Sequence, residues 1–466
     1  MEGRKQNKSG DNFGQNDRTA SDSYDGVQTF IGIIDNAFTE VYFTKEKLLE
    51  HILSPMNLNK AYKQAVSNNG SGGVDGMKTT ELLSWLGDHK DTLITSIYSG
   101  TYRPNPVRRA EIPKENGKRR QLGIPTVVDR FIQQAISQVL VTVYDPTFSD
   151  SSYGFRPCRD AHQALRHARV IISSGYWYAV DIDLEKFFDT VNQSRLIEIL
   201  SRTIKDGRVI SLIHKYLGAG VVVGSRYESS ATGVPQGSPL SPLPGNIMLH
   251  ELDRELEQRG HPFVRYADDS LIFCRSARAA ERVKESITRF IEGRLYLRVN
   301  REKTHSGEVV GMKFLGYSFY RCKGECRLCV HAKSCDRMKA RLKELTGRSN
   351  GMGYESRKSA LKLFIRGWVE YFKLADMKTL LSQTDEWLRR RIRMCIWKSW
   401  KRVKTRYRNL VRCGISKRQA WMWSNTRKSY WHTAGSFIMS VSVNNNHLRK
   451  AGYVFLSDYY VKLHRK

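Results

Sequence analysis

The sequence contains no apolar run near the roughly 18 residues that a membrane-spanning helix needs. Its first 26 residues are polar and lack the apolar core of a secretory signal peptide. Without such a peptide, the eight cysteines are expected to be mostly free thiols in a reducing compartment. We therefore expect no membrane association, a flexible N-terminal extension over residues 1–44, and a cytoplasmic location that allows association with the nucleoid.

Acidic residues are scarce relative to basic ones. The chain has 46 Asp and Glu against 77 Lys and Arg, a net charge of +31, so its field attracts polyanions, among which nucleic acid is the leading candidate. Residues 336–466 hold 31 Lys or Arg, only 8 Asp or Glu, and seven of the nine Trp. We expect this region to fold as a packed domain that binds phosphate, the alternative being a solvated basic surface on a helical domain.

Apolar residues recur with helical spacing in some segments and with strand spacing in others, and the predicted helices and strands do not alternate regularly. Residues 45–100 carry helical apolar spacing, and "RRAEIPKENGKRRQLGIP" is typical of two short strands joined by a basic hairpin. The stretch "YWYAVDIDL" at 176–184 predicts a buried strand, whereas the elements predicted after residue 336 are nearly all helices. This segregation indicates the α+β class.

Two adjacent carboxylates interrupt the strand-like stretch "PFVRYADDSLIFC" at residues 262–274. Because successive strand side chains point to opposite faces, Asp268 and Asp269 can serve one site only at a turn, which predicts a β-hairpin tip. Their repulsion favours a divalent cation, although such a pair alone is more often a solvated turn. Asp183 follows an apolar strand and is the best third ligand; Asp181, on the same strand face, is its rival.

The order of the motifs resembles that of one enzyme family, the reverse transcriptases encoded by group II introns, also called maturases. The similar segments span about residues 45–466 and include, in order, "SGGVDGM", "IPKENGKRRQLGIPTVVDRFIQQA", "SYGFRP", "DIDLEKFFDTVN", "GVPQGSPLSP", "RYADD", "LRVNREKT", "KFLGYSF", "IRGWVEYF" and "RIRMCIWKSWK". Several ordered motifs are far more specific than any single one.

The resemblance implies an α+β right-hand polymerase: fingers and palm of antiparallel sheet and helices, and a mostly helical basic thumb. The expected divisions are the extension at 1–44, a helical segment at 45–100, fingers and palm at 101–330, thumb or maturase domain at 331–415, and a basic nucleic-acid-binding segment at 416–466. The His- and Cys-containing endonuclease of many maturases has no counterpart, so we expect the endonuclease-lacking type.

The resemblance also assigns the carboxylates. Asp183, Asp268 and Asp269 correspond to the metal-binding triad, and the backbone carbonyl of Leu184 is an added ligand. Two Mg²⁺ ions, which Mn²⁺ can replace, would activate the primer 3′-hydroxyl and stabilise the leaving pyrophosphate. The motif register favours Asp183 over Asp181, which is then structural or supports the ligands.

Further positions match the nucleotide-binding residues of the family. Lys114 and Arg120 lie on the basic hairpin expected to bind the triphosphate of the incoming dNTP, and their chemistry suits phosphate. Phe188 matches the aromatic residue that contacts the sugar and excludes a 2′-hydroxyl, although periodicity alone makes it a core residue. Gln236 and Gly237 match residues that line the nucleotide pocket.

Two weaker assignments concern the leaving group and the primer. Lys303 matches a lysine proposed as general acid to pyrophosphate. Phe314, Leu315 and Gly316, in "KFLGY", resemble the primer grip, for which strand structure is an equally good explanation.

Four thiols occur close together in "CKGECRLCVHAKSC", namely Cys322, Cys326, Cys329 and Cys335, with His331 between them. They could bind zinc, but the spacing matches no recognised zinc motif and falls where the family has a variable hairpin. Zinc is therefore the minor alternative.

The leading hypothesis is an RNA-directed DNA polymerase encoded by a group II intron. Its expected partners are dNTPs, an RNA template, a DNA primer or target, and the intron RNA, whose splicing and retrotransposition it would assist. One alternative is a splicing-only maturase without polymerase activity, which would have no physical need for three carboxylates. The other is a defence-associated or diversity-generating reverse transcriptase. Oligomeric state is not indicated by the sequence.

Overall fold

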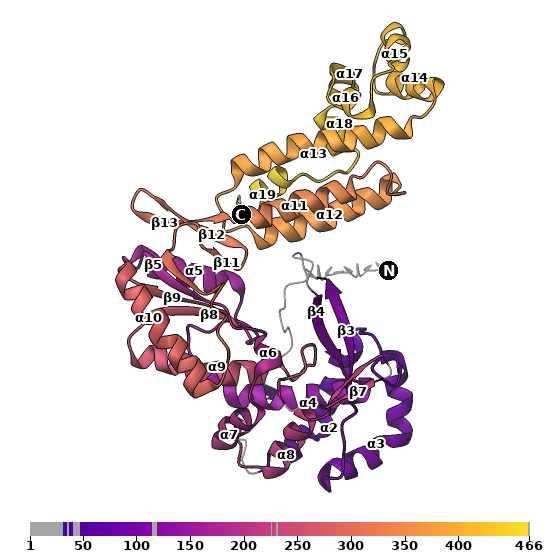
Figure 1. Ribbon diagram of the computed structural model, residues 1–466. Coiled ribbons are helices and arrows are strands. Elements are labelled where there is room, and N and C mark those ends of the chain that lie inside the picture. The colour runs from indigo at the N-terminus through magenta and orange to yellow at the C-terminus, as the bar shows by residue number, and fades with distance from the viewer. Residues whose placement is uncertain are drawn as a thin grey trace, which may run out of the picture. The chain divides into compact units, whose positions relative to one another are not determined.

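The computed structural model describes residues 31–34, 37–40, 47–113, 119–224, 226–229 and 232–464. The chain divides into two compact units (Figure 1). The larger unit contains the described residues up to His331 together with Leu374–Asp376, and the helical unit contains Ala332–Lys373 and the described residues from Met377 onward. None of the helices in these described segments is long and apolar enough to cross a membrane.

The larger unit begins with a two-stranded hairpin and a group of helices. Their bounds are β1 (Ile31–Ile34), β2 (Ala37–Glu40), α1 (Leu48–Ile52), α2 (Pro55–Ser67), η1 (Thr79–Glu81), α3 (Leu82–Tyr98), α4 (Val127–Tyr144) and η2 (Asp145–Thr147). Helix α2 begins at a proline, and the Ser54 side chain accepts from the Asn57 N–H as its N-cap. The buried Gln138 amide of α4 donates to Asn57 Oδ1 at 2.7 Å, which joins the two helices inside the main core.

A four-stranded sheet carries the basic hairpin. Its order is β4-β3-β6-β7, with β3 (Val107–Pro113), β4 (Arg119–Ile124), β6 (Val221–Val223) and β7 (Arg226–Glu228). Strands β3 and β4 are antiparallel, while β3 and β6 run parallel. Gly123 allows close packing here, because a Cβ on it would lie 2.8 Å from a methyl group of Val107.

The central sheet is antiparallel, in the order β10-β5-β9-β8. Its strands are β5 (Tyr178–Ile182), β8 (Phe263–Tyr266), β9 (Asp269–Cys274) and β10 (His305–Glu308). The surrounding helices are α5 (Ala161–Ser173), α6 (Phe187–Thr190), α7 (Gln193–Thr203), α8 (Gly207–Leu217), α9 (Pro242–Gln258), α10 (Ala277–Phe290) and the π-helical turn η3 (Ile291–Leu295). Val180 of β5 and Ile287 of α10 belong to one core that also includes α1, α2 and α4.

A small three-stranded sheet completes the larger unit. It consists of β11 (Lys313–Phe314), β12 (Tyr317–Cys322) and β13 (Glu325–Val330), all antiparallel. The Asp376 N–H donates to the Leu328 carbonyl at 2.8 Å, so the short segment Leu374–Asp376 belongs with this sheet.

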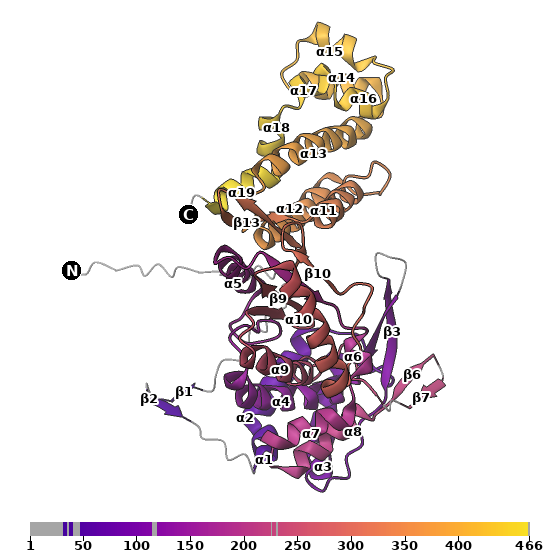
Figure 2. The same cartoon turned by 60° about the vertical axis from the view of Figure 1, so that its left-hand side comes forward.

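The described part of the second unit is helical (Figure 2). The helices are α11 (Ala332–Leu345), α12 (Tyr354–Tyr371), α13 (Lys378–Ser399), α14 (Val403–Arg412), α15 (Lys417–Ser424), α16 (Tyr430–Ala434), α17 (Phe437–Ser442), α18 (Asn445–Lys450) and α19 (Leu456–His464). Helix α13 contacts α11, α16 and α19. Its buried Asp385 accepts from the Leu456 and Ser457 N–H groups and so caps α19. A larger unit of strands and helices, followed along the chain by a helical unit, confirms the predicted α+β class.

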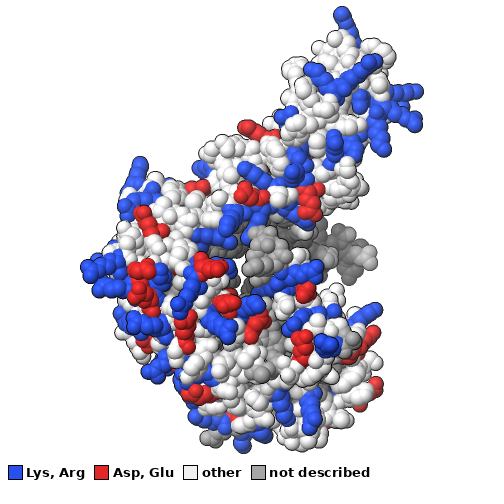
Figure 3. All heavy atoms as spheres, viewed as in Figure 1, with Lys and Arg blue, Asp and Glu red and all other residues white. Residues whose placement is uncertain are grey.

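Lys and Arg side chains gather over α14 and α15 on the face of the helical unit seen in Figure 3. Exposed aromatic residues accompany them, since Trp421 of α15 is 62% exposed and Phe437 of α17 is 70% exposed. Large exposed aromatic side chains among basic ones are suited to contact with nucleic acid, because they can stack on bases while the cations bind phosphate.

Candidate active site

The "RYADD" segment forms the turn between β8 and β9. Tyr266 pairs with Asp269, which leaves Ala267 and Asp268 as a two-residue loop. Ala267 has a φ of 57°, as the first loop residue of a type II′ turn has. The hairpin tip therefore holds Asp268, while Asp269 is the first residue of β9, one position further from the tip than expected. Both aspartates are exposed.

A buried network supports this turn from beneath. The guanidinium of Arg265, only 1% exposed, donates to both carboxylate oxygens of the fully buried Asp253 in α9, at 2.7 Å from Nε. Its Nη1 also donates to Asn246 Oδ1 and to the Ala267 carbonyl, each at 3.0 Å. Arg265 therefore ties the backbone of the turn to α9.

Gly154 completes the support, because a Cβ on it would lie 2.2 Å from the Ala267 nitrogen. The Asn246 amide donates to the Gly154 carbonyl at 2.8 Å, so the glycine and the arginine share one partner. Sequence reasoning missed these residues. The available signal was a lone arginine in an apolar strand, "FVRY", preceded by an acidic residue in the apolar face of "HELDREL".

Asp183 lies directly after β5 and is held through its backbone. Its N–H donates to Thr304 Oγ1 at 3.1 Å, and its carbonyl accepts from the Asn300 N–H at 2.8 Å. Leu184 forms an isolated bridge with Val299. The loop before β10 therefore fixes Asp183 and Leu184 at the end of the strand that pairs with β9.

Four carboxylates interact at this end of the sheet. Burial, followed by the charges of Asp268, Asp181 and Asp183, raises the pKa of Asp269 to about 6, so its carboxylate is crowded by protein although the residue is exposed. Burial and the charge of Asp183 likewise raise the pKa of Asp181 to about 6, against the opposing charges of His305 and Lys313. The predicted triad and its rival are thus close enough to repel one another.

The ammonium of Lys303 lies 3.1 Å from Asp183 Oδ2 and 3.4 Å from Oδ1. With Asp183 in this ion pair, no three His, Cys, Asp or Glu side chains in the described residues are positioned together to hold a metal ion. The donor set still suits a divalent cation, because it consists of partly exposed carboxylates whose mutual repulsion a cation would relieve. Asp183 would exchange Lys303 for the ion.

Two expected nucleotide-binding elements meet beside β4. Arg120 donates from Nε to Gln236 Oε1 at 3.0 Å, and the Gly123 N–H donates to the Gln236 carbonyl at 2.7 Å. Gly237 has a φ of 105°, a conformation that favours glycine. The structure thus brings Arg120, Gln236 and Gly237 together, whereas Lys114 lies outside the described residues.

Phe188 lies in α6, five residues after Asp183, and is 9% exposed. Its ring packs edge-on against Phe187, with centroids 5.0 Å apart, and both rings approach Gly245. The Phe188 carbonyl accepts from the Val234 N–H at 2.6 Å, which places α6 against the segment that leads to Gln236. The ring is therefore held rigidly beside the "VPQG" loop, and its contact with a sugar stays a prediction.

The expected primer grip is a tight hairpin. Phe314 pairs with Tyr317, and the two loop residues Leu315 and Gly316 have φ values of 50° and 81°. Both values are typical of a type I′ turn, and the left-handed conformation is strained for leucine. Phe314 is buried, so its side chain serves the core.

The cysteines of the β12–β13 hairpin are spread along it. Cys322 pairs with Glu325, and Cys326 and Cys329 are three residues apart on β13, where an odd spacing points side chains to opposite faces. Burial raises the pKa of the Cys326 thiol to about 11, which disfavours the thiolate that zinc requires. Cys335 lies in α11, in the other unit. The hairpin geometry gives no support to zinc.

Comparison with known families agrees with the fold. A family model described as reverse transcriptase (RNA-dependent DNA polymerase) matches residues 112–319, which include the central sheet and all four aspartates. The chain is therefore a reverse transcriptase, and the predicted enzyme class, RNA-directed DNA polymerase, is confirmed. Enzymes of this family depend on divalent metal ions and act on nucleic acid.

A second family model, described as group II intron, maturase-specific domain, matches residues 335–414, from α11 to α14. Protein YkfC of Escherichia coli (strain K12) is 33% identical over 337 residues, which cover 63% of this chain and 88% of that protein. The group II intron-encoded protein LtrA of Lactococcus lactis subsp. cremoris is 31% identical over 352 residues. The chain belongs to the group II intron reverse transcriptase and maturase family.

The LtrA alignment covers 61% of this chain but only 57% of LtrA, so the chain spans little more than half of that relative. Among solved structures, a partial Cas6-RT-Cas1--Cas2 complex matches with a TM-score of 0.33 and 21% identity, covering 56% of this chain and 46% of that one. A similarity at that level supports no argument about function.

Proposed function

We propose that this protein copies an RNA template by adding dNTPs to a DNA primer, using two Mg²⁺ ions that Mn²⁺ can replace. The observation that carries the proposal is the position of Asp181, Asp183, Asp268 and Asp269 at one end of the paired strands β5 and β9, where their charges repel one another. A protein that only bound RNA would gain nothing from holding four carboxylates against their repulsion, whereas metal-assisted nucleotidyl transfer needs such a cluster.

The proposed role of each residue follows from its position in the site. Asp183, next to the bridged Leu184, and Asp268, in the loop, are the ligands proposed for both ions, with the Leu184 carbonyl added. Bound there, the ions would supply Lewis-acid activation of the primer 3′-hydroxyl and charge neutralisation of the pyrophosphate. Asp269 shapes the field near the primer end. Lys303, released from Asp183, would be free to donate a proton to the leaving pyrophosphate.

The nucleotide is positioned by a second group of residues. Arg120, kept in place by Gln236, offers its remaining guanidinium N–H groups to the triphosphate, where a forked donor suits phosphate oxygens. Lys114 is proposed to join it. Gly237 lets backbone approach the nucleotide closely, and the Phe188 ring selects against a 2′-hydroxyl.

Phe314, Leu315 and Gly316 are proposed to hold the primer.

The helical unit is proposed to bind the intron RNA and so to assist splicing and retrotransposition. Its support is the concentration of Lys and Arg in residues 336–466 together with the maturase-specific match. That same match favours the intron class over a defence-associated or diversity-generating enzyme. The carboxylate cluster favours an active polymerase over a splicing-only maturase.

Primer extension tests the catalytic proposal. Asp268→Asn keeps the size of the side chain but removes a charge that the metal needs, so we expect dNTP incorporation on an RNA template to be abolished, with RNA binding nearly intact. Asp91→Asn, a matched change on the exposed surface of α3, should extend primers like the parent protein. Undiminished synthesis by Asp268→Asn would refute the site. Extension should also require Mg²⁺ or Mn²⁺ and stop when either is chelated.

A further inference from the structure

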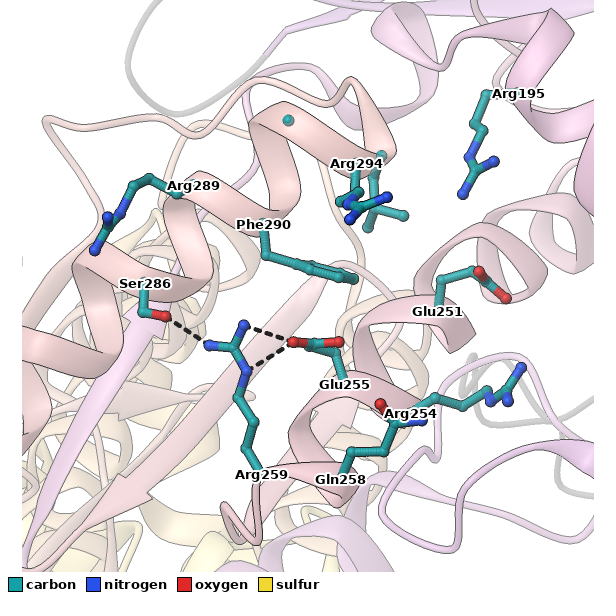
Figure 4. A pocket seen from close by; sticks show the side chains of 12 residues that line it. Arg195, Glu251, Arg254, Glu255, Gln258, Arg259, Ser286, Arg289, Phe290 and Arg294 are labelled. Carbon is teal, nitrogen blue, oxygen red and sulfur yellow. Dashed lines mark hydrogen bonds and ion pairs between the residues drawn. The ribbon is translucent and has the colours of Figure 1, made fainter.

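The larger unit contains a pocket of about 690 Å³ that none of the site residues named above lines. It lies among α7, α9 and the end of α10 with η3 (Figure 4). Five arginines line it against only two acidic side chains, Glu251 and Glu255. We call it the arginine pocket and define it by Phe290 and the arginines Arg195, Arg254, Arg259, Arg289 and Arg294.

The two acidic side chains of the pocket are already neutralised. Glu255 pairs with Arg259, which also donates to Ser286 Oγ at 2.6 Å, as the dashed lines in Figure 4 mark. Glu251 accepts from Arg202, outside the pocket, at 3.0 Å. The glutamates therefore leave the remaining arginines without a counter-charge inside the pocket.

The other arginines have unused donors. Arg195 pairs with Glu198 through Nη1, but its buried Nε has no hydrogen-bond partner in the described structure. No hydrogen bond or ion pair joins the side chain of Arg254, Arg289 or Arg294 to any described residue. The like charges of five arginines around one pocket repel one another, and an anion with several oxygens would offset that repulsion.

Helix electrostatics explains only part of this arrangement. Arg289 lies in the last turn of α10, where the helix dipole favours a cation. Arg195, however, lies in the first turn of α7, where the dipole disfavours one, and Arg254 lies in the interior of α9. A shared anionic ligand would favour all of these positions.

The floor of the pocket is suited to a nucleotide. Phe290 is half-buried, and Figure 4 shows its ring between Arg294 and Glu255, where a base could stack on it. Arg294 is carried by η3, a single π-helical turn that ends at Tyr296 with a φ of 55°. Single π-helical turns are frequent at functional sites.

We infer that the arginine pocket binds the phosphate backbone of RNA, with Phe290 as a stacking surface. The inference rests on the proposed function, since it adds an RNA contact in the larger unit to the one proposed for the helical unit. Guanidinium groups fork to phosphate oxygens, and an overall charge of +31 brings a polyanion to such a surface.

The test uses the full chain with Arg254→Gln, Arg289→Gln and Arg294→Gln combined. The matched control combines Arg166→Gln, Arg169→Gln and Arg278→Gln, three exposed arginines outside the pocket that give the same change in net charge. Affinity for a defined RNA hairpin is measured over a salt series. We expect the pocket variant to lose at least about tenfold in affinity and its log–log salt slope to fall by about one per arginine, with a much smaller change in the control.

Equal losses in the two variants would overturn the inference, because overall charge alone would then explain them. It would also be overturned if the parent protein bound tripolyphosphate or ATP in the pocket and the variant lost that binding with unchanged RNA affinity, since the ligand would then be a free nucleotide. A separate assay measures whether the parent protein extends a preannealed primer. If it does not, while the pocket variant still loses more RNA affinity than the control, the polymerase proposal is refuted and the inference about the arginine pocket is supported.

Discussion

At the scale of single residues, the carboxylates differ in their surroundings although they are chemically alike. Asp268 lies in the loop, Asp269 begins a strand, and Asp183 is paired with Lys303. Asp181 and Asp269 have pKa values raised to about 6, so their charged forms carry a cost that a bound cation would offset. Asp181 is thus part of the field around the proposed metal site.

The aromatic pair of α6 allows a matched test of sugar selection. Phe188→Ala should raise the ratio of rNTP to dNTP incorporation, because the ring proposed to exclude the 2′-hydroxyl is removed. Phe187→Ala, a neighbouring core truncation in the same helix, should cost a similar amount of stability, about 3–5 kcal/mol, and leave the ratio unchanged. Incorporation ratios measured on one RNA template decide the matter, and an equal ratio in the two variants would remove the steric role of Phe188.

At the scale of elements, the turn that carries Asp268 depends on its attachment to α9. Arg265 in β8 joins the fully buried Asp253 in α9 to the Ala267 carbonyl. The loop before β10 holds the segment of Asp183 in place through hydrogen bonds to the Asp183 backbone. Both arrangements use rigid partners to hold short segments that carry charge.

Variants of the Arg265 and Asp253 pair can distinguish an effect on stability from an effect on the position of the turn. Arg265→Met leaves Asp253 buried without its partner and should lower the free energy of unfolding by about 3–5 kcal/mol, measured by denaturant titration. Adding Asp253→Leu removes the unpaired charge and should restore much of that loss. Polymerase activity should stay low in the double variant, because the Ala267 carbonyl still lacks its donor. Full activity in a stable double variant would show that Arg265 only maintains the fold.

At the scale of the whole molecule, charge is distributed unevenly between the parts of the chain. Residues 336–466 carry an excess of 23 positive charges. Among the helices they form, α11, α16 and α19 contact α13, α14 packs against α15, and Asp385 caps α19. The basic residues therefore belong to a folded surface, which is suited to a structured RNA.

That surface predicts a steep salt dependence. Affinity of the full chain for structured RNA should fall by about three orders of magnitude between 50 and 200 mM salt, as counterions compete for the phosphates. Sucrose at matched osmolality should change the RNA affinity little. This control distinguishes an effect of salt on charge interactions from an effect on water activity. A flat response measured by filter binding would mean that the basic excess serves some purpose other than phosphate binding.

The sequence by itself determined the hairpin of "RYADD", the strand that ends before Asp183, the α+β class and the basic character of the C-terminal third. These features depend on local alternation, turn formation and composition, which neighbouring residues decide. The ordered motifs also identified the family correctly.

Only the tertiary structure decided which distant groups meet. Lys303 reaches Asp183 across 120 positions, Arg120 reaches Gln236 across 116, and Arg265 supports the turn through α9. The arginine pocket likewise combines three helices whose basic residues look like ordinary surface positions in the sequence. Local patterns cannot specify such pairs, because the free energy that selects them comes from packing the elements together around a shared core.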